Sequence, residues 1–369
     1  MKGRGRVWSI AWRLGVCGLL MFWIFHAIFT EEGRQVLSRQ GIAWETLSRG
    51  QQWESAWSHG PQELWRVLCL VEPWALLASF GCMGLTILLG VFRWRRVLGV
   101  QGLELPLGRT AEISLVAHFF NSFLLGSTGG DLMKAYYAAR ETHHLKTEAV
   151  VTVVADRLIG LFSMLLFACL MTVPNFVLLA THRRLGAITW FILLMLLGCG
   201  TLMSLAFWGG LSRRWPRARS WLRGLPKGDW LERSLDSCRR FGKQPAFLGE
   251  TLAISMALNV ASVLQVTFLN WGLGLNISPL VLFAIVPMII CISALPITPN
   301  GLGVRENLYV WILATPGIGV PATQALSLSL LAYAGSLLWS LVGGLVYASL
   351  KESHHLREIA QADPKTENG

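Results

Sequence analysis

The chain has 369 residues, of which 53% are hydrophobic and only 14% charged, and its mean hydropathy is +0.49. Soluble domains carry about 25% charged residues, so the composition excludes an ordinary soluble protein and predicts an all-α polytopic membrane protein. The net charge of +11 lies largely in loops beside apolar segments, which is the positive-inside pattern of membrane proteins and no indication of nucleic-acid binding.

The first half of the chain predicts two full spans followed by a broken hairpin. Apolar runs cover 14–29 and 71–92, and both have basic residues on one flank. Basic flanks stay in the cytoplasm, so we expect a cytoplasmic N-terminus and an outer loop at 31–67. The tryptophans of this loop suit either an interfacial segment or a small extramembrane helix pair. Segment 107–140 has basic residues on both sides and a glycine-rich break, which predicts a re-entrant helical hairpin that opens inside.

The second half repeats this order. Apolar runs at 149–179 and 186–211 lead into the basic segment 211–246, for which we expect amphipathic helices on the inner leaflet, facing anionic lipid head groups. A fifth span at 247–273 precedes a second broken segment, 278–316, whose nearly uncharged flanks place its opening outside.

The last span covers 323–350, and the polar tail 351–369 is expected to be cytoplasmic and disordered. The prediction for 1–350 is thus one transmembrane bundle of six full spans and two re-entrant hairpins that open in opposite directions. That is the layout of an inverted-topology repeat, in which substrates bind near the midplane at discontinuous helices.

Charged residues inside apolar segments are costly and indicate a functional site by default. In the first break Gly129 and Gly130 precede Asp131 and Lys134, which share one face of a helix. A glycine-rich turn at a helix start attracts anions such as phosphate, and Lys134 would add a positive charge. The alternative is that Asp131 only caps the helix.

Two further charged pairs follow. Asp156 and Arg157 are adjacent, so on a helix they point about 100° apart and cannot pair with each other. Asp156 is the better candidate, because Arg157 is long enough to reach the membrane interface. After the second break, Gly303 and Arg305 form another phosphate-facing turn, while Glu306 either joins that site or caps the next helix.

Three motifs carry a resemblance to a known family. They are N-x-x-L-x-G-S-T-G-G-D-x-x-K at 121–134, A-D-R-L-I-G-L at 155–161 and P-x-T-P-N-G-L-G-V-R-E at 296–306. In order and spacing the chain resembles the lysylphosphatidylglycerol synthase transmembrane-region family of flippase-like membrane proteins, in its form without the aminoacyl-transferase domain. The resemblance implies a role in moving lipid, with prenyl-linked sugars as further candidate cargo. Lys134 departs from the arginine that relatives often carry there, so a bidentate phosphate contact is not expected.

We therefore expect a lipid translocase or lipid-handling protein of a bacterial inner membrane, which moves a phospholipid or a lipid-linked substrate between leaflets. Its expected partners are membrane lipids, in particular anionic phospholipid or a lipid-linked substrate, and a transferase, with no nucleic acid, cofactor, metal site or catalytic residue. The alternatives are a membrane-embedded transferase acting on lipid-linked sugars and a non-catalytic scaffold. The expected substrate-binding residues are Asn121, Gly129, Gly130, Asp131, Lys134, Asp156, Arg157, Asn300, Gly301, Gly303, Arg305 and Glu306.

Overall fold

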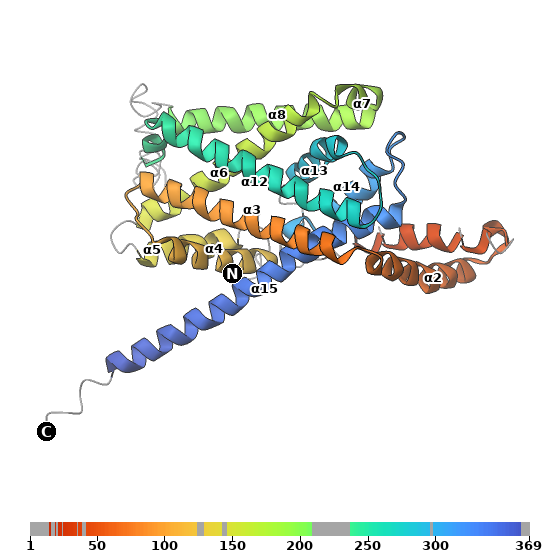
Figure 1. Cartoon of the computed structure of the whole chain (residues 1–369), viewed down its shortest axis with the longest axis horizontal. Helices are drawn as coiled ribbons and strands as arrows, with labels where there is room; N and C mark the ends of the chain where they lie inside the picture. The colour runs from red at the N-terminus through yellow and green to blue at the C-terminus, as the bar shows by residue number, and fades with distance from the viewer. Residues whose placement is uncertain are drawn as a thin grey trace, which may run out of the picture.

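The computed structural model describes residues 15, 19, 21–23, 25–34, 36–38, 42–123, 129–141, 146–208, 237–295 and 298–362. These residues form helices and connecting turns with no strand among them, and most helices lie along the long axis of the molecule (Figure 1). In chain order they are η1 (Trp44–Thr46), α2 (Arg49–Cys69), α3 (Pro73–Val100), α4 (Leu107–Phe123), α5 (Gly129–Glu141), α6 (Lys146–Thr172), α7 (Phe176–Thr181), α8 (Arg183–Phe207), α12 (Pro245–Gly272), α13 (Pro279–Ser293), η2 (Pro299–Gly301), α14 (Val304–Leu313) and α15 (Ala322–Ala362).

Five of the described helices are long and apolar enough to cross a membrane: residues 73–100, 147–172, 183–207, 245–272 and 322–349. The predicted all-α polytopic membrane protein is thereby confirmed. Three of the helices begin with a proline, at Pro73, Pro245 and Pro279. Proline fits the first helical turn because its missing N–H would have no partner there.

Helix α3 is longer than its apolar run. The sequence predicts a span that ends at 92, but the helix continues to Val100 and buries Val91, Trp94, Val97 and Leu98 on one side. This buried stripe has helical spacing, so the basic run 93–96 belongs to the helix and is not a flanking loop. As a result Arg93 lies inside the bundle.

The two broken segments form two pairs of short helices. Helices α4 and α5 have 17 and 13 residues, and α13 and α14 have 15 and 10. Each is shorter than the roughly 20 residues that a full span needs. The members of each pair pack on each other, and the pairs lie toward opposite ends of the bundle (Figure 1). Most of the glycine-rich break, 124–128, lies outside the described residues, as do 296–297.

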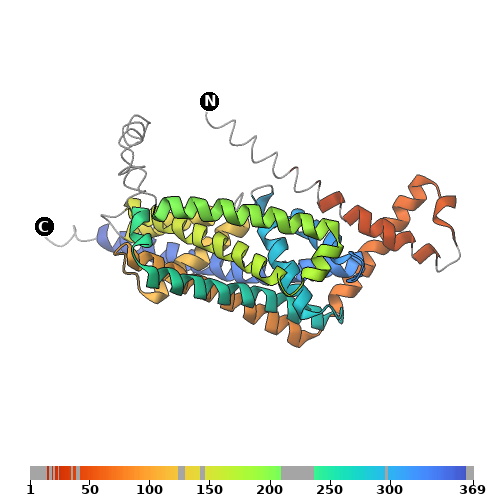
Figure 2. The same cartoon turned by 90° about the horizontal axis from the view of Figure 1, so that it is seen from above.

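The packing of the bundle follows a regular plan. Helices α3 and α12 form the most extensive helix contact and run in opposite directions, since the N–H of Glu72 before α3 donates to the carbonyl of Gly272 at the end of α12 (3.0 Å). Helix α4 packs on α15, and α13 packs on α6. Helix α5 packs on α6, and α14 packs on α15. Figure 2 shows the same helices from above, closely layered along the whole bundle.

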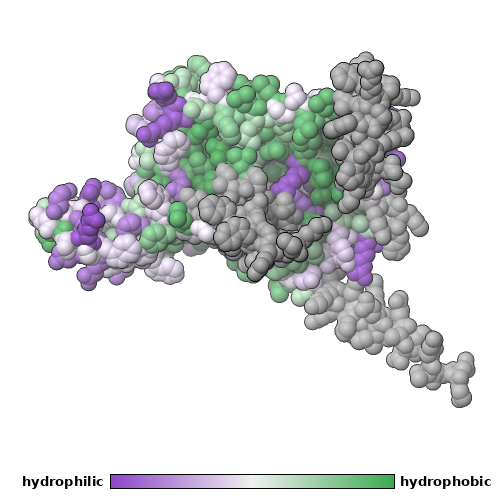
Figure 3. Space-filling view, turned by 180° about the vertical axis from the view of Figure 1, so that it is seen from behind, coloured by the Kyte–Doolittle hydropathy of each residue, from purple (hydrophilic) through white to green (hydrophobic). Residues whose placement is uncertain are grey.

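The segment predicted as an outer loop is a pair of helices that projects from one end of the bundle (Figures 1 and 2). Helix α2 packs on the helical residues up to 38, with Phe29 edge-on to Trp57 at 5.2 Å between ring centroids and Gly60 against the ring of Phe29. This is the helix-pair alternative for 31–67. Figure 3 shows that hydrophilic colour gathers on this projection, whereas the bundle is mostly hydrophobic on that face.

The two ends of the chain and the basic segment 211–246 are described only in part. Part of the predicted span 14–29 and most of 211–246 lie outside the described residues. The sequence predicts a disordered tail from residue 351, but helix α15 continues to Ala362. The polar residues after 350 extend the helix of the last span. Residues 363–369 lie outside the described part.

Candidate functional site

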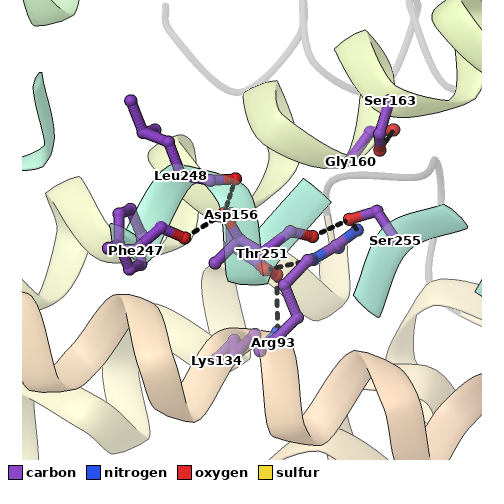
Figure 4. A network of polar contacts seen from close by, with 9 residues as sticks. All are labelled: Arg93, Lys134, Asp156, Gly160, Ser163, Phe247, Leu248, Thr251 and Ser255. Carbon is purple, nitrogen blue, oxygen red and sulfur yellow. Dashed lines mark hydrogen bonds and ion pairs between the residues drawn. The ribbon is translucent and has the colours of Figure 1, made fainter. Parts of the chain in front are cut away.

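Asp156 forms the centre of a buried ionic cluster in the bundle (Figure 4). Its Oδ1 accepts a hydrogen bond from Nε of Arg93 on α3 at 2.8 Å, and its Oδ2 lies 3.1 Å from Nζ of Lys134 on α5. The side chains of Arg93, Lys134 and Asp156 are only 12%, 13% and 10% exposed. Three helices, α3, α5 and α6, are therefore joined through one carboxylate.

The cluster is not electrically balanced. Two positive side chains face one carboxylate, so 2 − 1 leaves a charge of +1 in a mostly buried place. An isolated charge in an apolar interior is costly, and a negatively charged group that reached the cluster would complete its balance. This excess of positive charge would suit a negatively charged ligand such as a phosphate.

Lys134 and Arg93 are held by further contacts. The ammonium of Lys134 lies over the ring of the fully buried Trp94, 4.2 Å from its centroid, which is a cation–π arrangement. Nη1 of Arg93 donates to Oγ of Ser255 at 3.2 Å, and that hydroxyl donates to the carbonyl of Thr251 (2.7 Å). Figure 4 shows this chain of contacts running from α3 to α12. Both cations are thus fixed in orientation before any ligand arrives.

Asp131 and Arg157 form a second ion pair at the rim of the cluster. Their side chains are 29% and 45% exposed, so this pair is more accessible than Asp156. The sequence places Asp131 and Lys134 on one face, and the structure gives them different partners on α6. Asp156 and Arg157 do not pair with each other, in agreement with their helical spacing.

The glycines of the first break allow α5 to start against the backbone of α4. The N–H of Gly130 donates to Oδ1 of Asn121 at 2.9 Å, and a Cβ at Gly130 would overlap the carbonyl oxygen of Ala117. Asn121 therefore holds the start of α5, next to the partly buried Gly129. These residues position the helix that carries Lys134.

The second break is a left-handed turn closed by a buried carboxylate. Asn300, Gly301 and Gly303 have φ of 53°, 70° and 81°, a region that favours glycine and tolerates asparagine. Glu306 is fully buried, and its Oε2 accepts the N–H of Gly303 at 2.7 Å while its Oε1 pairs with Arg305. Glu306 thus caps α14, which is one of the two roles that the sequence allowed.

Arg305 also contacts the last helix. Its guanidinium lies 4.3 Å from the ring centroid of Tyr333 on α15, and the Tyr333 hydroxyl accepts from Nδ2 of Asn300 (3.3 Å). Nε of Arg305 and the hydroxyl oxygens of Thr298 and Ser293 are buried without a hydrogen-bond partner in the described chain. Buried polar atoms are normally satisfied, so these three atoms beside one break are candidates for contact with water or a ligand.

The two breaks belong to separate clusters, and one helix of each short pair, α4 and α14, packs on α15. His118 of α4 bonds to the carbonyl of Ser336 at 3.2 Å, three residues along α15 from Tyr333. Within the described residues no hydrogen bond or ion pair joins Asp131, Lys134, Asp156 or Arg157 to Arg305 or Glu306. The structure thus brings together seven of the predicted residues around the first break and five around the second. The described parts of the chain hold no group of three metal-ligating side chains.

Arg93 is the functional candidate that the sequence prediction missed, because the basic run 93–96 reads as a topology signal. A signal for its burial is nevertheless present. The apolar positions Val91, Trp94 and Val97 continue the helical spacing through the basic run, which means that the helix extends past the apolar segment and carries Arg93 with it.

Comparison with known proteins agrees with this architecture. The family model described as the lysylphosphatidylglycerol synthase TM region matches residues 53–344, from within α2 to within α15, and includes both breaks. The chain is also similar to a UPF0104 membrane protein of Methanothermobacter thermautotrophicus, with 26% identity over 317 residues that cover 77% of this chain and 87% of the relative. The chain belongs to the lysylphosphatidylglycerol synthase TM region family.

Proposed function

We propose that this protein moves a phospholipid or lipid-linked substrate between the leaflets of a bacterial inner membrane, without a chemical change in the lipid. The observation that carries the proposal is the buried Arg93–Asp156–Lys134 cluster with its uncompensated positive charge. A lipid phosphate is the negative group that a membrane supplies in abundance. Lys134 would meet it, while Asp156 and Trp94 hold Lys134 in place.

The packing plan supports an inverted repeat, the layout typical of proteins with alternating access. Suppose that each of α3, α4, α5 and α6 is exchanged with its counterpart in the second half, in the order α12, α13, α14 and α15. Each pair of packed helices among these eight then corresponds to another packed pair. The α4–α15 contact becomes α13–α6, α5–α6 becomes α14–α15, and α3–α12 becomes itself. The paired helices α3 and α12 run in opposite directions, as inversion requires.

The contacts at the two breaks follow the same exchange. Lys134 on α5 reaches Asp156 on α6, and Arg305 on α14 reaches Tyr333 on α15. Arg93 on α3 likewise corresponds to Gln265 on α12, whose Nε2 donates to the carbonyl of Ala332 on α15 at 3.0 Å. Each half therefore offers a cation beside its own break. We propose that a head group passes from one to the other, with both short helix pairs acting as re-entrant hairpins.

The proposal is tested with purified protein in vesicles that contain a fluorescent phospholipid, whose flipping exposes it to a membrane-impermeant quencher. Lys134→Gln removes the extra positive charge but leaves the Arg93–Asp156 pair intact. We expect its flipping rate to fall at least about tenfold, which corresponds to about 1.4 kcal/mol of lost interaction.

Arg140→Gln is the matched control, since it removes a positive charge from an exposed position on the same helix, and it should stay within about twofold of the unmodified protein. An unchanged flipping rate in folded Lys134→Gln protein would show that the cluster does not handle the lipid. Vesicles in which the unmodified protein moved none of the phospholipid or lipid-linked substrates tried would refute translocation itself.

A further inference from the structure

A groove of about 920 Å³ lies on the surface of α3 and α12, and no residue of either break lines it. It is at the end of the bundle opposite α2, where α3 ends and α12 begins (Figure 1). Apolar side chains form its wall, among them Leu89, Phe92 and Ile254. The volume is in the range of pockets that hold small ligands, and the wall continues into the exposed apolar face of α3 at Leu85 and Leu88.

Four charged side chains line this groove, two of each sign. Arg96 lies 3.4 Å from Glu250 across the helix pair, which leaves Arg95 and Glu104. Neither of these has a hydrogen bond or ion pair with any residue in the described part of the chain, and both are exposed. The groove therefore offers a free positive and a free negative charge beside an apolar wall.

The loop that carries Glu104 is held in place by its neighbouring residues. Its neighbours Leu103 and Leu105 are buried, and the preceding Gln101 is anchored by a 2.7 Å bond from its Nε2 to the carbonyl of Ser237. The loop is therefore packed against the bundle on both sides of Glu104. Arg95, on the last turns of α3, is equally fixed at its backbone.

We infer that this groove binds one phospholipid with a zwitterionic, primary-amine head group. Its phosphate would lie at Arg95, its ammonium at Glu104, and an acyl chain along Leu89, Phe92 and Ile254. An anionic head group such as phosphoglycerol would satisfy Arg95 with its phosphate but offer Glu104 no positive partner, so the pairing of signs favours the amine-bearing lipid. A groove of this kind can hold lipid in a protein that moves none, so the inference stands apart from translocation.

The test uses the full chain in lipid nanodiscs with photoreactive phospholipids that carry a diazirine in the acyl chain. Three probes differ only in head group: phosphatidylethanolamine, phosphatidylcholine and phosphatidylglycerol. After illumination, mass spectrometry measures labelling of peptides from 89–105 and 244–254. We expect the ethanolamine probe to label these peptides most strongly, because a primary ammonium can donate hydrogen bonds to a carboxylate and a quaternary one cannot.

Two single-charge variants separate the contributions of the head group. Glu104→Gln should lower ethanolamine labelling about fivefold and leave glycerol labelling unchanged, and Arg95→Gln should lower both by a similar factor, the loss expected for one exposed charged contact. Arg183→Gln is the matched control. Arg183 is an exposed arginine in another apolar groove, which lies near the opposite end of the bundle and has no acidic residue in its lining. It should change neither value.

Equal labelling by the glycerol and ethanolamine probes, or labelling spread evenly over the apolar surface of the protein, would overturn the inference. So would an unchanged head-group preference in Glu104→Gln. Loss of flipping in the vesicle assay, together with intact labelling here, would refute the proposed function and uphold the groove.

Discussion

Asp156 forms ion pairs with two positively charged side chains, Arg93 and Lys134. Removing the carboxylate charge and removing one of the two positive charges therefore have unequal consequences. Without Asp156 the side chains of Arg93 and Lys134 would face each other as two buried positive charges. Without Lys134 a neutral pair remains. We therefore expect the fold to depend on the carboxylate more than on the second positive side chain, so single substitutions can separate a structural role from the proposed functional one.

Asp156→Asn should destabilise the protein by about 3–5 kcal/mol, the cost of a buried charge pair that loses one partner. Lys134→Gln should stay within about 1 kcal/mol, because the lost hydrogen bond is offset by relief of the unbalanced charge. Thermal unfolding in detergent measures both variants side by side. Equal destabilisation would mean that Lys134 is needed for the fold as much as Asp156 is, and the charge argument would fail.

The residues of this cluster show what a sequence can and cannot predict. Asp156 and Lys134 are recognisable because each is a charge in or beside an apolar run. Their pairing is not, since it depends on how α5 and α6 meet across a break. Arg93 was not predicted, because it belongs to a basic run that resembles the cytoplasmic flank of a span. The buried apolar positions through Trp94 nevertheless continue beyond this run.

At the scale of elements, the short helix α5 is distinguished by the two glycines with which it starts. Helix α5 begins where the carbonyl of Ala117 and the side chain of Asn121 leave no space for a side chain at position 130. The glycine therefore sets the distance between α4 and α5, and through it the position of Lys134. The sequence predicted a break there, but glycine content alone does not distinguish a flexible turn from a close backbone contact.

Gly130→Ala should cost about 1–3 kcal/mol, the range for a methyl group forced into a packed site, and it should also slow flipping because α5 must move away from α4. Gly198→Ala on α8 is the control. A Cβ there meets nothing within 4 Å, so the higher helix propensity of alanine should leave stability unchanged or raise it by up to about 1 kcal/mol. Melting curves of the two variants in the same detergent decide between these expectations, and equal curves would refute the close contact.

At the scale of the whole molecule, the order of the elements was largely predictable from charge and hydropathy. The two broken segments and the long spans after them appear in the structure as α4–α5 with α6 and α13–α14 with α15. The exchange that maps one set of contacts onto the other was not predictable in detail, because the two halves share little sequence beyond a glycine-rich break and a charge. The contact between α3 and α12 on which it depends arises only in the folded chain.

The proposed inverted layout makes a topological prediction about four exposed or partly exposed positions. Gly108 and Thr147 flank the first short helix pair, and Ser278 and Pro316 flank the second. In a background with all seven native cysteines replaced, single cysteines at 108 and 147 should react with a membrane-impermeant maleimide only from the cytoplasmic face. Cysteines at 278 and 316 should react only from the outer face, because positively charged loops are retained inside and the uncharged flanks of the second pair are not.

Intact cells and inverted vesicles measure the two faces with the same reagent, and a cysteine at exposed Gln244, near the end of the basic segment, is expected to react from the cytoplasmic face. Labelling of 108 and 147 from opposite faces would mean that α4 and α5 together cross the membrane as one interrupted span. The two hairpins would then no longer open toward opposite sides. In that case the exchange of contacts would be a coincidence of packing, and Arg93, Lys134 and Asp156 would lie on one side of the membrane without a counterpart on the other.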